Sequence, residues 1–113
     1  ILKEANDQKI NIIAKEVFSN GLLTNANKDY HQEDIHNLQH TAKEINLTLE
    51  QLSYLWVYQL PFIKIILTGA STIDQLQENL NCLKKINTTI PTLDHFSMSV
   101  DDYWSTRKKL NWN

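Results

Sequence analysis

The chain has 113 residues, of which 42% are hydrophobic and 21% are charged, as in ordinary soluble globular domains. Its 11 basic and 13 acidic residues give a formal charge of −2, which excludes the basic surface that nucleic acids or anionic membranes require. No apolar run is long enough to span a membrane, and no signal-peptide pattern is present. We therefore expect a cytoplasmic chain in which the single cysteine, Cys82, is a small hydrophobe.

The first part of the chain predicts one strand between a helix and a long loop. Residues 2–8 are expected to be the last turns of a helix, and the β-branched run at residues 10–14 predicts a buried strand. Residues 15–24 form a loop in this interpretation. The polar segment 25–32 has no periodicity and is expected to be the most mobile part.

Two helices are predicted next, over residues 33–45 and 49–59. Asn46 separates them, because asparagine tolerates the left-handed conformation that ends helices. Thr48 and Gln51 have the spacing of a capping box at the start of the second helix. The first helix has one apolar face: Ile35, Leu38, Ala42 and Ile45. The second is expected to be largely buried.

The following stretch is expected to organise the rest of the chain. A buried strand over residues 63–67 leads through Gly69 into a helix over residues 73–86, with Thr72 and Gln75 in capping-box spacing. The helix carries an apolar stripe that we expect to face the core: Ile73, Leu76, Leu80, Leu83 and Ile86. A strand that ends in a glycine and a helix N-terminus can bind phosphate, although such turns are common in α/β proteins.

The C-terminal tail, residues 87–113, is predicted to be coil as far as residue 97 and then a short helix over residues 100–110, capped by Ser99. Alternating helices and strands indicate parallel βα units. Two strands alone cannot make a stable covered sheet, so we expect residues 1–113 to be a single partial domain. The chain begins at Ile1 without an initiator methionine, and we expect an upstream portion.

Four stretches in order resemble the C-terminal third of an aldo/keto reductase. They are IIAKEVFSNGLLT at residues 12–24, LEQLSYLWV at 49–57, LTGASTIDQLQENL at 67–80 and YWSTRKKLNWN at 103–113. The last is similar to the YWxxRxxLPWN ending of one subgroup. The resemblance implies an α/β fold, namely the C-terminal portion of a (β/α)8 TIM barrel with about two strands and flanking helices.

The same resemblance implies that the full protein is an NAD(P)-dependent oxidoreductase that reduces small carbonyl substrates. The catalytic Asp, Tyr, Lys and His of the family are expected upstream of Ile1, so no catalytic residue and no metal ligand is assigned in this chain. Cofactor binding is what the chain is expected to retain. The matching residues are Lys15, Glu16, Val17, Phe18 and Asn20 in the first loop, and Gly69, Ala70, Ser71, Thr72, Gln75 and Asn79 around the second turn.

Two departures from the family pattern leave the choice between NADP and NAD open. Members that hold the 2′-phosphate of NADP usually place Lys or Arg where Gly69 or Gln75 stands here, and a neutral Gln cannot form a charge-assisted pair with phosphate. Lys15 and Glu16 stand where many members have an aromatic residue and a serine, although one subgroup has Lys-Glu. We expect binding by the chain alone to be weak or absent.

The alternative interpretation is a non-catalytic interaction module, a remnant of a barrel. Its open strand edges and apolar helix faces would then be covered by self-association or by rearranged packing. His36 and His40 lie one helical turn apart but are expected to be a solvated helix face. Tyr103, Trp104 and Trp112 are expected to pack the tail across a barrel end, with Arg107 paired to a carboxylate.

Overall fold

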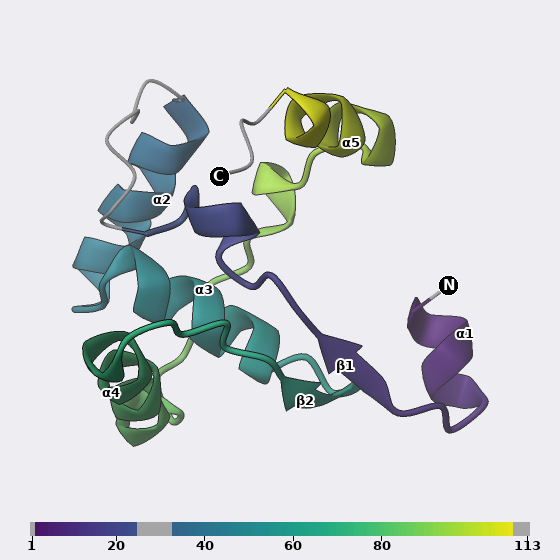
Figure 1. The fold of residues 1–113 in the computed structure, drawn as a ribbon, viewed down its shortest axis with the longest axis horizontal. Helices are drawn as coiled ribbons and strands as arrows, with labels where there is room; N and C mark the ends of the chain where they lie inside the picture. The colour runs from purple at the N-terminus through teal and green to yellow at the C-terminus, as the bar shows by residue number, and fades with distance from the viewer. Residues whose placement is uncertain (1, 25–32, 110–113) are drawn as a thin grey trace.

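The computed structural model describes residues 2–24 and 33–109 of the chain (Figure 1). These residues form a helix-rich α/β structure around a short sheet. In chain order the elements are α1 (Leu2–Asp7), β1 (Ile12–Ala14), α2 (Glu33–Glu44), α3 (Leu49–Tyr58), β2 (Ile63–Ile66), α4 (Ile73–Cys82) and α5 (Val100–Lys108), with 3-10 turns at Ser19–Gly21, Leu83–Lys85 and Asp94–Phe96. In this part of the chain no helix is long and apolar enough to cross a membrane.

The two strands pair in parallel, as the alternation of helices and strands predicts. Ile12 lies opposite Ile63 and Ala14 opposite Ile66, with an irregularity in the ladder after Ile12. Parallel neighbours need a long crossover connection, and α2 and α3 lie within it. The prediction of a parallel βα arrangement is confirmed for the described residues.

The prediction that both strands are buried is wrong. Ile13 and Ile65 are 54% and 51% exposed, and Leu67 just beyond β2 is 52% exposed. Successive side chains of a strand point to opposite faces, and α3 covers the face that carries Ala14 and Ile66. The other face of the pair has no cover among residues 2–24 and 33–109.

Helix α3 lies at the centre of the structure, so the expectation that the chain is organised around the β2–α4 stretch is also wrong. One core cluster joins α3 to α2 and to the segment before α5 through Leu52, Leu55, Ala42 and Leu93. A second cluster lies on another side of α3, where Tyr54 packs with Val17 and Cys82. As predicted, α3 is largely buried.

The apolar pattern of α4 predicts which of its faces packs against the core, and in the structure the opposite face does so. Ile73 is 85% exposed and Leu80 is 50% exposed, and Leu76 and Leu83 of the same stripe are exposed too. The buried residues of α4 are Asn79 and Cys82. The physical reason is that α3 and the loop after β1 pack against the face of α4 that carries Cys82, through Tyr54 and Val17.

Several local predictions are confirmed. Asn46 ends the α2 region at φ 57°, and both glycines have positive φ, 89° at Gly21 and 62° at Gly69. Ile35 and Ala42 of α2 are buried as expected. The helix predicted over residues 73–86 is shorter, because α4 gives way to a 3-10 turn after Cys82.

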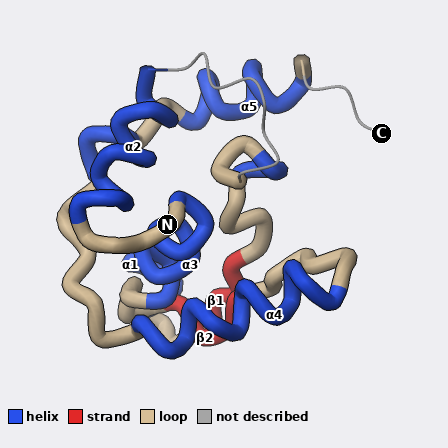
Figure 2. The backbone as a smooth tube through the Cα atoms, turned by 90° about the vertical axis from the view of Figure 1, so that its left-hand side faces the viewer, coloured by secondary structure: helices blue, strands red, loops and turns tan. Residues whose placement is uncertain are grey.

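The segment over residues 87–97, which the sequence predicts to be coil, packs partly into the core. Leu93 is only 9% exposed in the α2–α3 cluster, and a 3-10 turn follows it at Asp94–Phe96. The expected mobility of residues 25–32 and the packing of Trp112 lie outside the described residues. Helix α5 lies at the opposite end of the molecule from α4 (Figure 2).

Candidate functional site

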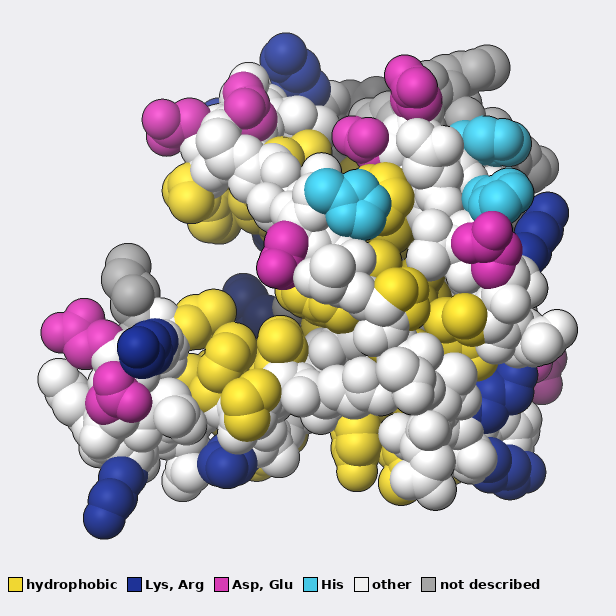
Figure 3. All heavy atoms as spheres, turned by 180° about the vertical axis from the view of Figure 1, so that it is seen from behind, with side chains coloured by type: hydrophobic (Ala, Val, Ile, Leu, Met, Phe, Trp, Pro, Cys, Tyr) yellow, Lys and Arg dark blue, Asp and Glu magenta, His cyan; other side chains and the backbone are white. Residues whose placement is uncertain are grey.

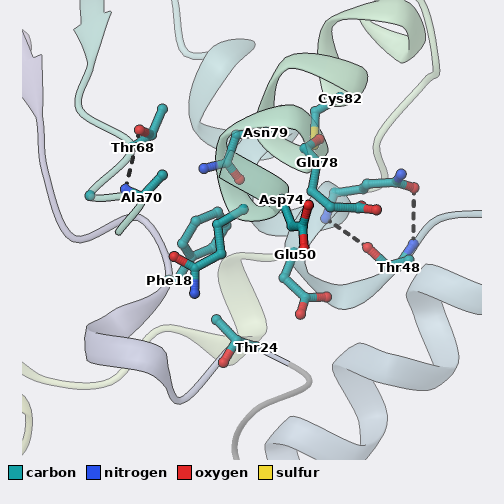
Figure 4. Close-up of a pocket in the computed structure, with 13 residues that line it drawn as sticks. Phe18, Thr24, Thr48, Glu50, Thr68, Ala70, Asp74, Glu78, Asn79 and Cys82 are labelled. Carbon is teal, nitrogen blue, oxygen red and sulfur yellow. Dashed lines mark hydrogen bonds between the residues drawn. The ribbon is translucent and has the colours of Figure 1, made fainter. Parts of the chain in front are cut away.

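A cavity of about 290 Å³ lies where the loop after β1, the turn after β2 and the first parts of α3 and α4 meet (Figure 4). The residues that line it are Phe18, Thr24, Thr48, Glu50, Gln51, Thr68, Gly69, Ala70, Asp74, Gln75, Glu78, Asn79 and Cys82. Ligands of parallel α/β proteins bind beyond the carboxyl ends of strands. The cavity therefore stands where the fold class predicts a binding site.

The structure brings together residues from both predicted cofactor stretches. Those that line the cavity are Phe18 from the first loop and Gly69, Ala70, Gln75 and Asn79 from the second turn and helix. Phe18 and the α4 residues are far apart in sequence, so this meeting depends on the packing of Val17 against Cys82 below the cavity. A hydrophobic contact thus fixes the relative position of the two stretches.

The other predicted residues do not line this cavity. Lys15 is exposed, and Val17 is buried in the core with Tyr54 and Cys82. Asn20 lines a separate small cavity beside α5. Ser71 and Thr72 are exposed in the turn. Their contact with a ligand stays a prediction.

The turn from β2 into α4 satisfies many of its own polar groups. Gly69 at φ 62° reverses the chain, and a β-carbon there would meet nothing within 4 Å, so the constraint is on the backbone alone. The Thr72 hydroxyl accepts a hydrogen bond from the backbone N–H of Gln75 at 3.2 Å. The Gln75 side chain does not complete the predicted capping box. Its Oε1 accepts instead from the Ser71 N–H at 2.9 Å and the Ser71 hydroxyl at 3.0 Å.

Among the residues that line the cavity, Asn79 is the best candidate for a hydrogen bond to a ligand. It is only 7% exposed, and its side-chain amide has no hydrogen-bond partner within residues 2–24 and 33–109. Figure 4 shows this amide directed into the space beside Ala70 and above Phe18. The amide has one donor group and one acceptor group, and both can form hydrogen bonds to a ligand or to water in the cavity.

Three carboxylates also line the cavity, and sequence reasoning missed them. Asp74 and Glu78 come from α4 and Glu50 from α3. Asp74, Glu78 and Cys82 are spaced by four residues, so helical periodicity could have placed them on one face. Glu50 carried no such signal, because it reaches the cavity only through the packing of α3 against α4.

Cys82 lines the cavity with a thiol that is almost fully buried. Burial raises the pKa of its thiol, and the nearby Glu78 carboxylate raises that pKa further. The thiol donates a hydrogen bond to the Glu78 backbone oxygen at 3.4 Å. Because the thiolate is the reactive form, Cys82 serves as a small buried side chain, as predicted.

A cluster of polar side chains, outside the cavity, joins the loop after β1 to α5. Arg107 donates hydrogen bonds from both terminal nitrogens to the Glu16 carboxylate, one of them at 2.9 Å, and also to the Tyr103 hydroxyl at 3.2 Å. The guanidinium lowers the pKa of Glu16 below its ordinary range, and the carboxylate in turn raises the pKa of Arg107. The predicted pairing of Arg107 with a carboxylate is confirmed. Its partner is a residue that the sequence assigned to cofactor binding.

The described residues contain no group of three or more His, Cys, Asp or Glu side chains placed to hold a metal ion. Of the two histidines one turn apart on α2, His40 is 71% exposed and lies 3.7 Å from Glu44. That exposure agrees with a solvated helix face.

The parallel strands are joined by helices, and a cavity of ligand size lies at the carboxyl end of β2, where α/β folds of this class place their binding sites. Residues 1–95 match the sequence model described as the Aldo/keto reductase family. The chain therefore belongs to the aldo/keto reductase family, and its fold derives from a TIM barrel, of which the described residues contain two strands. No curated protein matches the chain significantly. The predicted subgroup ending at residues 103–113 lies beyond the matched range and stays a prediction.

Proposed function

We propose that this chain provides the adenosine-binding part of a nicotinamide dinucleotide site in a carbonyl oxidoreductase. The cofactor would be NADP or NAD, and the substrate a small carbonyl compound. The observation that carries the proposal is the position of Asn79, a residue only 7% exposed that lines the cavity and whose amide has no hydrogen-bond partner in the described part of the chain. The residues that would donate the proton and orient the carbonyl are expected outside this chain.

The chemistry of an asparagine amide suits an adenine ring. Its NH₂ donates and its oxygen accepts, and these two groups match the N7 acceptor and the N6 amino group of adenine. Phe18 on the opposite side of the cavity offers an aromatic surface for the same base (Figure 4). The short side chains of Gly69 and Ala70 allow the backbone to approach the ribose and phosphates closely.

The nicotinamide end of this proposal rests on Lys15 and Glu16 at the end of β1. Lys15 is exposed and free to move toward a ligand, whereas Arg107 holds the Glu16 carboxylate. We propose that Glu16 contributes by fixing the loop, and that Val17, buried below it, holds the loop in place. The Ser71 N–H would bind a phosphate only after releasing the Gln75 side chain.

Titration of the full 113-residue chain with ADP, followed by nuclear magnetic resonance shifts, tests the adenosine site. We expect Asn79→Ala to weaken binding by about fivefold to tenfold, the loss of one or two net hydrogen bonds. Asn81→Ala on the same helix is the matched control, because Asn81 does not line the cavity. Equal binding by the wild type and Asn79→Ala would refute the role of Asn79.

A second candidate function is favoured by the uncovered apolar surface. The stripe of α4 and the bare face of the strand pair expose residues that soluble domains usually cover, among them Leu76, Leu80 and Ile65. Hydrophobic side chains also lie open on the face shown in Figure 3. We propose that these surfaces support self-association, the property expected of a non-catalytic interaction module.

A further inference from the structure

Helix α5 is attached to the rest of the molecule mainly by polar contacts. It lies at the edge of the structure (Figure 1), and none of its residues is buried. Its half-buried residues share one face of the helix and are Tyr103, Thr106 and Arg107. The apolar side chains of Val100 and Trp104 are 72% and 50% exposed. Apolar burial, which fixes α3 in the core, therefore contributes little to the attachment of α5.

Arg107 supplies the main contact of that face. Its guanidinium donates to both oxygens of the Glu16 carboxylate and to the Tyr103 hydroxyl. A cavity of about 60 Å³ remains between α5 and the loop after β1, with Asn20 on one side and Thr106 on the other, so the two are not closely packed. A two-pronged contact between arginine and a carboxylate is directional and charge-assisted, and salt screens it where solvent reaches it.

The loop that this contact holds has an unfavourable backbone conformation. Glu16, Ser19 and Asn20 have φ of 56°, 46° and 62°, in the left-handed region that L-residues rarely adopt. Within the loop, the Gly21 N–H donates to the Phe18 backbone oxygen at 3.0 Å. Such a conformation persists only where surrounding contacts fix it, and α5 provides one of those contacts.

We infer that α5 is a detachable clasp, and that Arg107 is the positioning residue through which α5 keeps the loop after β1 in its left-handed conformation. When the pair with Glu16 breaks, α5 separates and the loop relaxes, while α3 and its two core clusters stay folded. Phe18 lies in this loop and lines the large cavity, so the clasp also controls one wall of that cavity. The effect on a ligand rests on the proposed adenosine site, whereas the clasp itself does not.

Amide hydrogen exchange of the full 113-residue chain, followed by nuclear magnetic resonance, tests the clasp without any ligand. We expect the amides of Gly21 in the loop and Tyr103 in α5 to exchange through one shared opening, at least about tenfold faster than the amide of the fully buried Leu55 in α3. Low concentrations of urea should accelerate Leu55 but not the other two, because opening the clasp exposes little surface. Concentrated salt should accelerate Gly21 and Tyr103, because it screens the ion pair.

Arg107→Gln should accelerate exchange at Gly21 and Tyr103 by about threefold to tenfold, the range for a partly exposed two-pronged pair. Lys108→Gln is the matched control, because it removes the same charge from an exposed position of α5 and should leave both rates unchanged. The swap Glu16→Arg/Arg107→Glu should return both rates to within about threefold of the wild type, because opposite charges again face each other.

Two results would overturn the clasp. Acceleration of Tyr103 alone in Arg107→Gln would show that α5 does not hold the loop. Exchange of Gly21 and Tyr103 only in step with Leu55 as urea is added would show that α5 and the loop detach only when the whole chain unfolds. Circular dichroism of each variant shows whether it folds.

Discussion

Glu16 connects two parts of the chain that lie 91 residues apart, because its carboxylate accepts hydrogen bonds from Arg107 of α5. The residue itself has a φ of 56°, in the left-handed region that costs an L-residue about 1 to 2 kcal/mol. Trp104 lies beside the pair, with its ring centre 5.5 Å from the guanidinium carbon. The carboxylate and guanidinium side chains are 27% and 20% exposed, so the pair is partly shielded from solvent.

The pair makes the stability of the chain depend on pH in the acid range. Arg107 lowers the pKa of Glu16 below its ordinary value of 4.5 in the folded state only. The stabilisation is therefore complete above about pH 5, near the unfolded pKa, and is lost as the pH falls through the lower folded pKa. We expect Glu16→Gln to be less stable than the wild type at pH 7 but to lose less stability on acidification, as measured by urea unfolding at several pH values.

Asp7→Asn, which removes an exposed carboxylate at the end of α1, serves as the control and should keep the wild-type acid dependence. Parallel curves for the wild type and Glu16→Gln would contradict the role of the pair. Because Arg107 is expected to stay charged over the whole range, the change with pH reports on the carboxylate alone.

At the scale of single elements, the helix starts show how local signals act. Thr48 forms a complete capping box with α3, in which its hydroxyl accepts from the Gln51 N–H at 3.1 Å and the Gln51 side chain accepts from the Thr48 N–H at 3.2 Å. At the start of α4 only the first of these two bonds forms, from the Gln75 N–H to the Thr72 hydroxyl. Helix α3 also holds both core clusters, so its start matters to the whole molecule.

We expect Thr48→Ala to lower the free energy of unfolding by about 1 to 2 kcal/mol, the upper part of the range for a lost N-cap. Thr72→Ala should cost about 0.5 to 1 kcal/mol, because Gln75 keeps its bonds to Ser71 and α4 is less buried. Urea unfolding followed by circular dichroism measures both. Thr48→Ser retains the hydroxyl and should stay close to the wild type, and an equal loss in the two alanine variants would contradict this ranking.

These elements also show what the sequence can and cannot predict. The positions of the helices, the caps at Thr48 and Ser99, and the stop at Asn46 follow from local residue patterns, and the structure confirms them. Periodicity located the apolar stripe of α4 correctly but could not say what covers it. The position of Glu50 in the lining of the cavity depends on tertiary packing, for which one sequence carries no signal.

At the scale of the whole molecule, two apolar surfaces lack cover in the described residues. On α4 they include Ile73 at 85% exposed, Leu76 at 45% and Leu80 at 50%. On the bare face of the strand pair they include Ile13 at 54% and Ile65 at 51%. A closed barrel buries the inner face of its strands and the inner face of its helices. The exposure of these two surfaces is therefore expected, because the described residues form only part of a barrel.

We expect the purified chain to associate into dimers or larger species, because burying these side chains stabilises by about 25 cal/mol per Å² of apolar surface. Multi-angle light scattering measures the mass directly. Leu76→Glu/Leu80→Glu places charges in the stripe and should shift the chain toward the monomer, since buried unpaired carboxylates are costly. Gln77→Glu adds one negative charge to an exposed polar position of α4, outside the stripe, and should leave the mass unchanged. A folded wild-type monomer at all concentrations would refute self-association. It would also leave the α4 stripe without the role proposed for it in an interaction module.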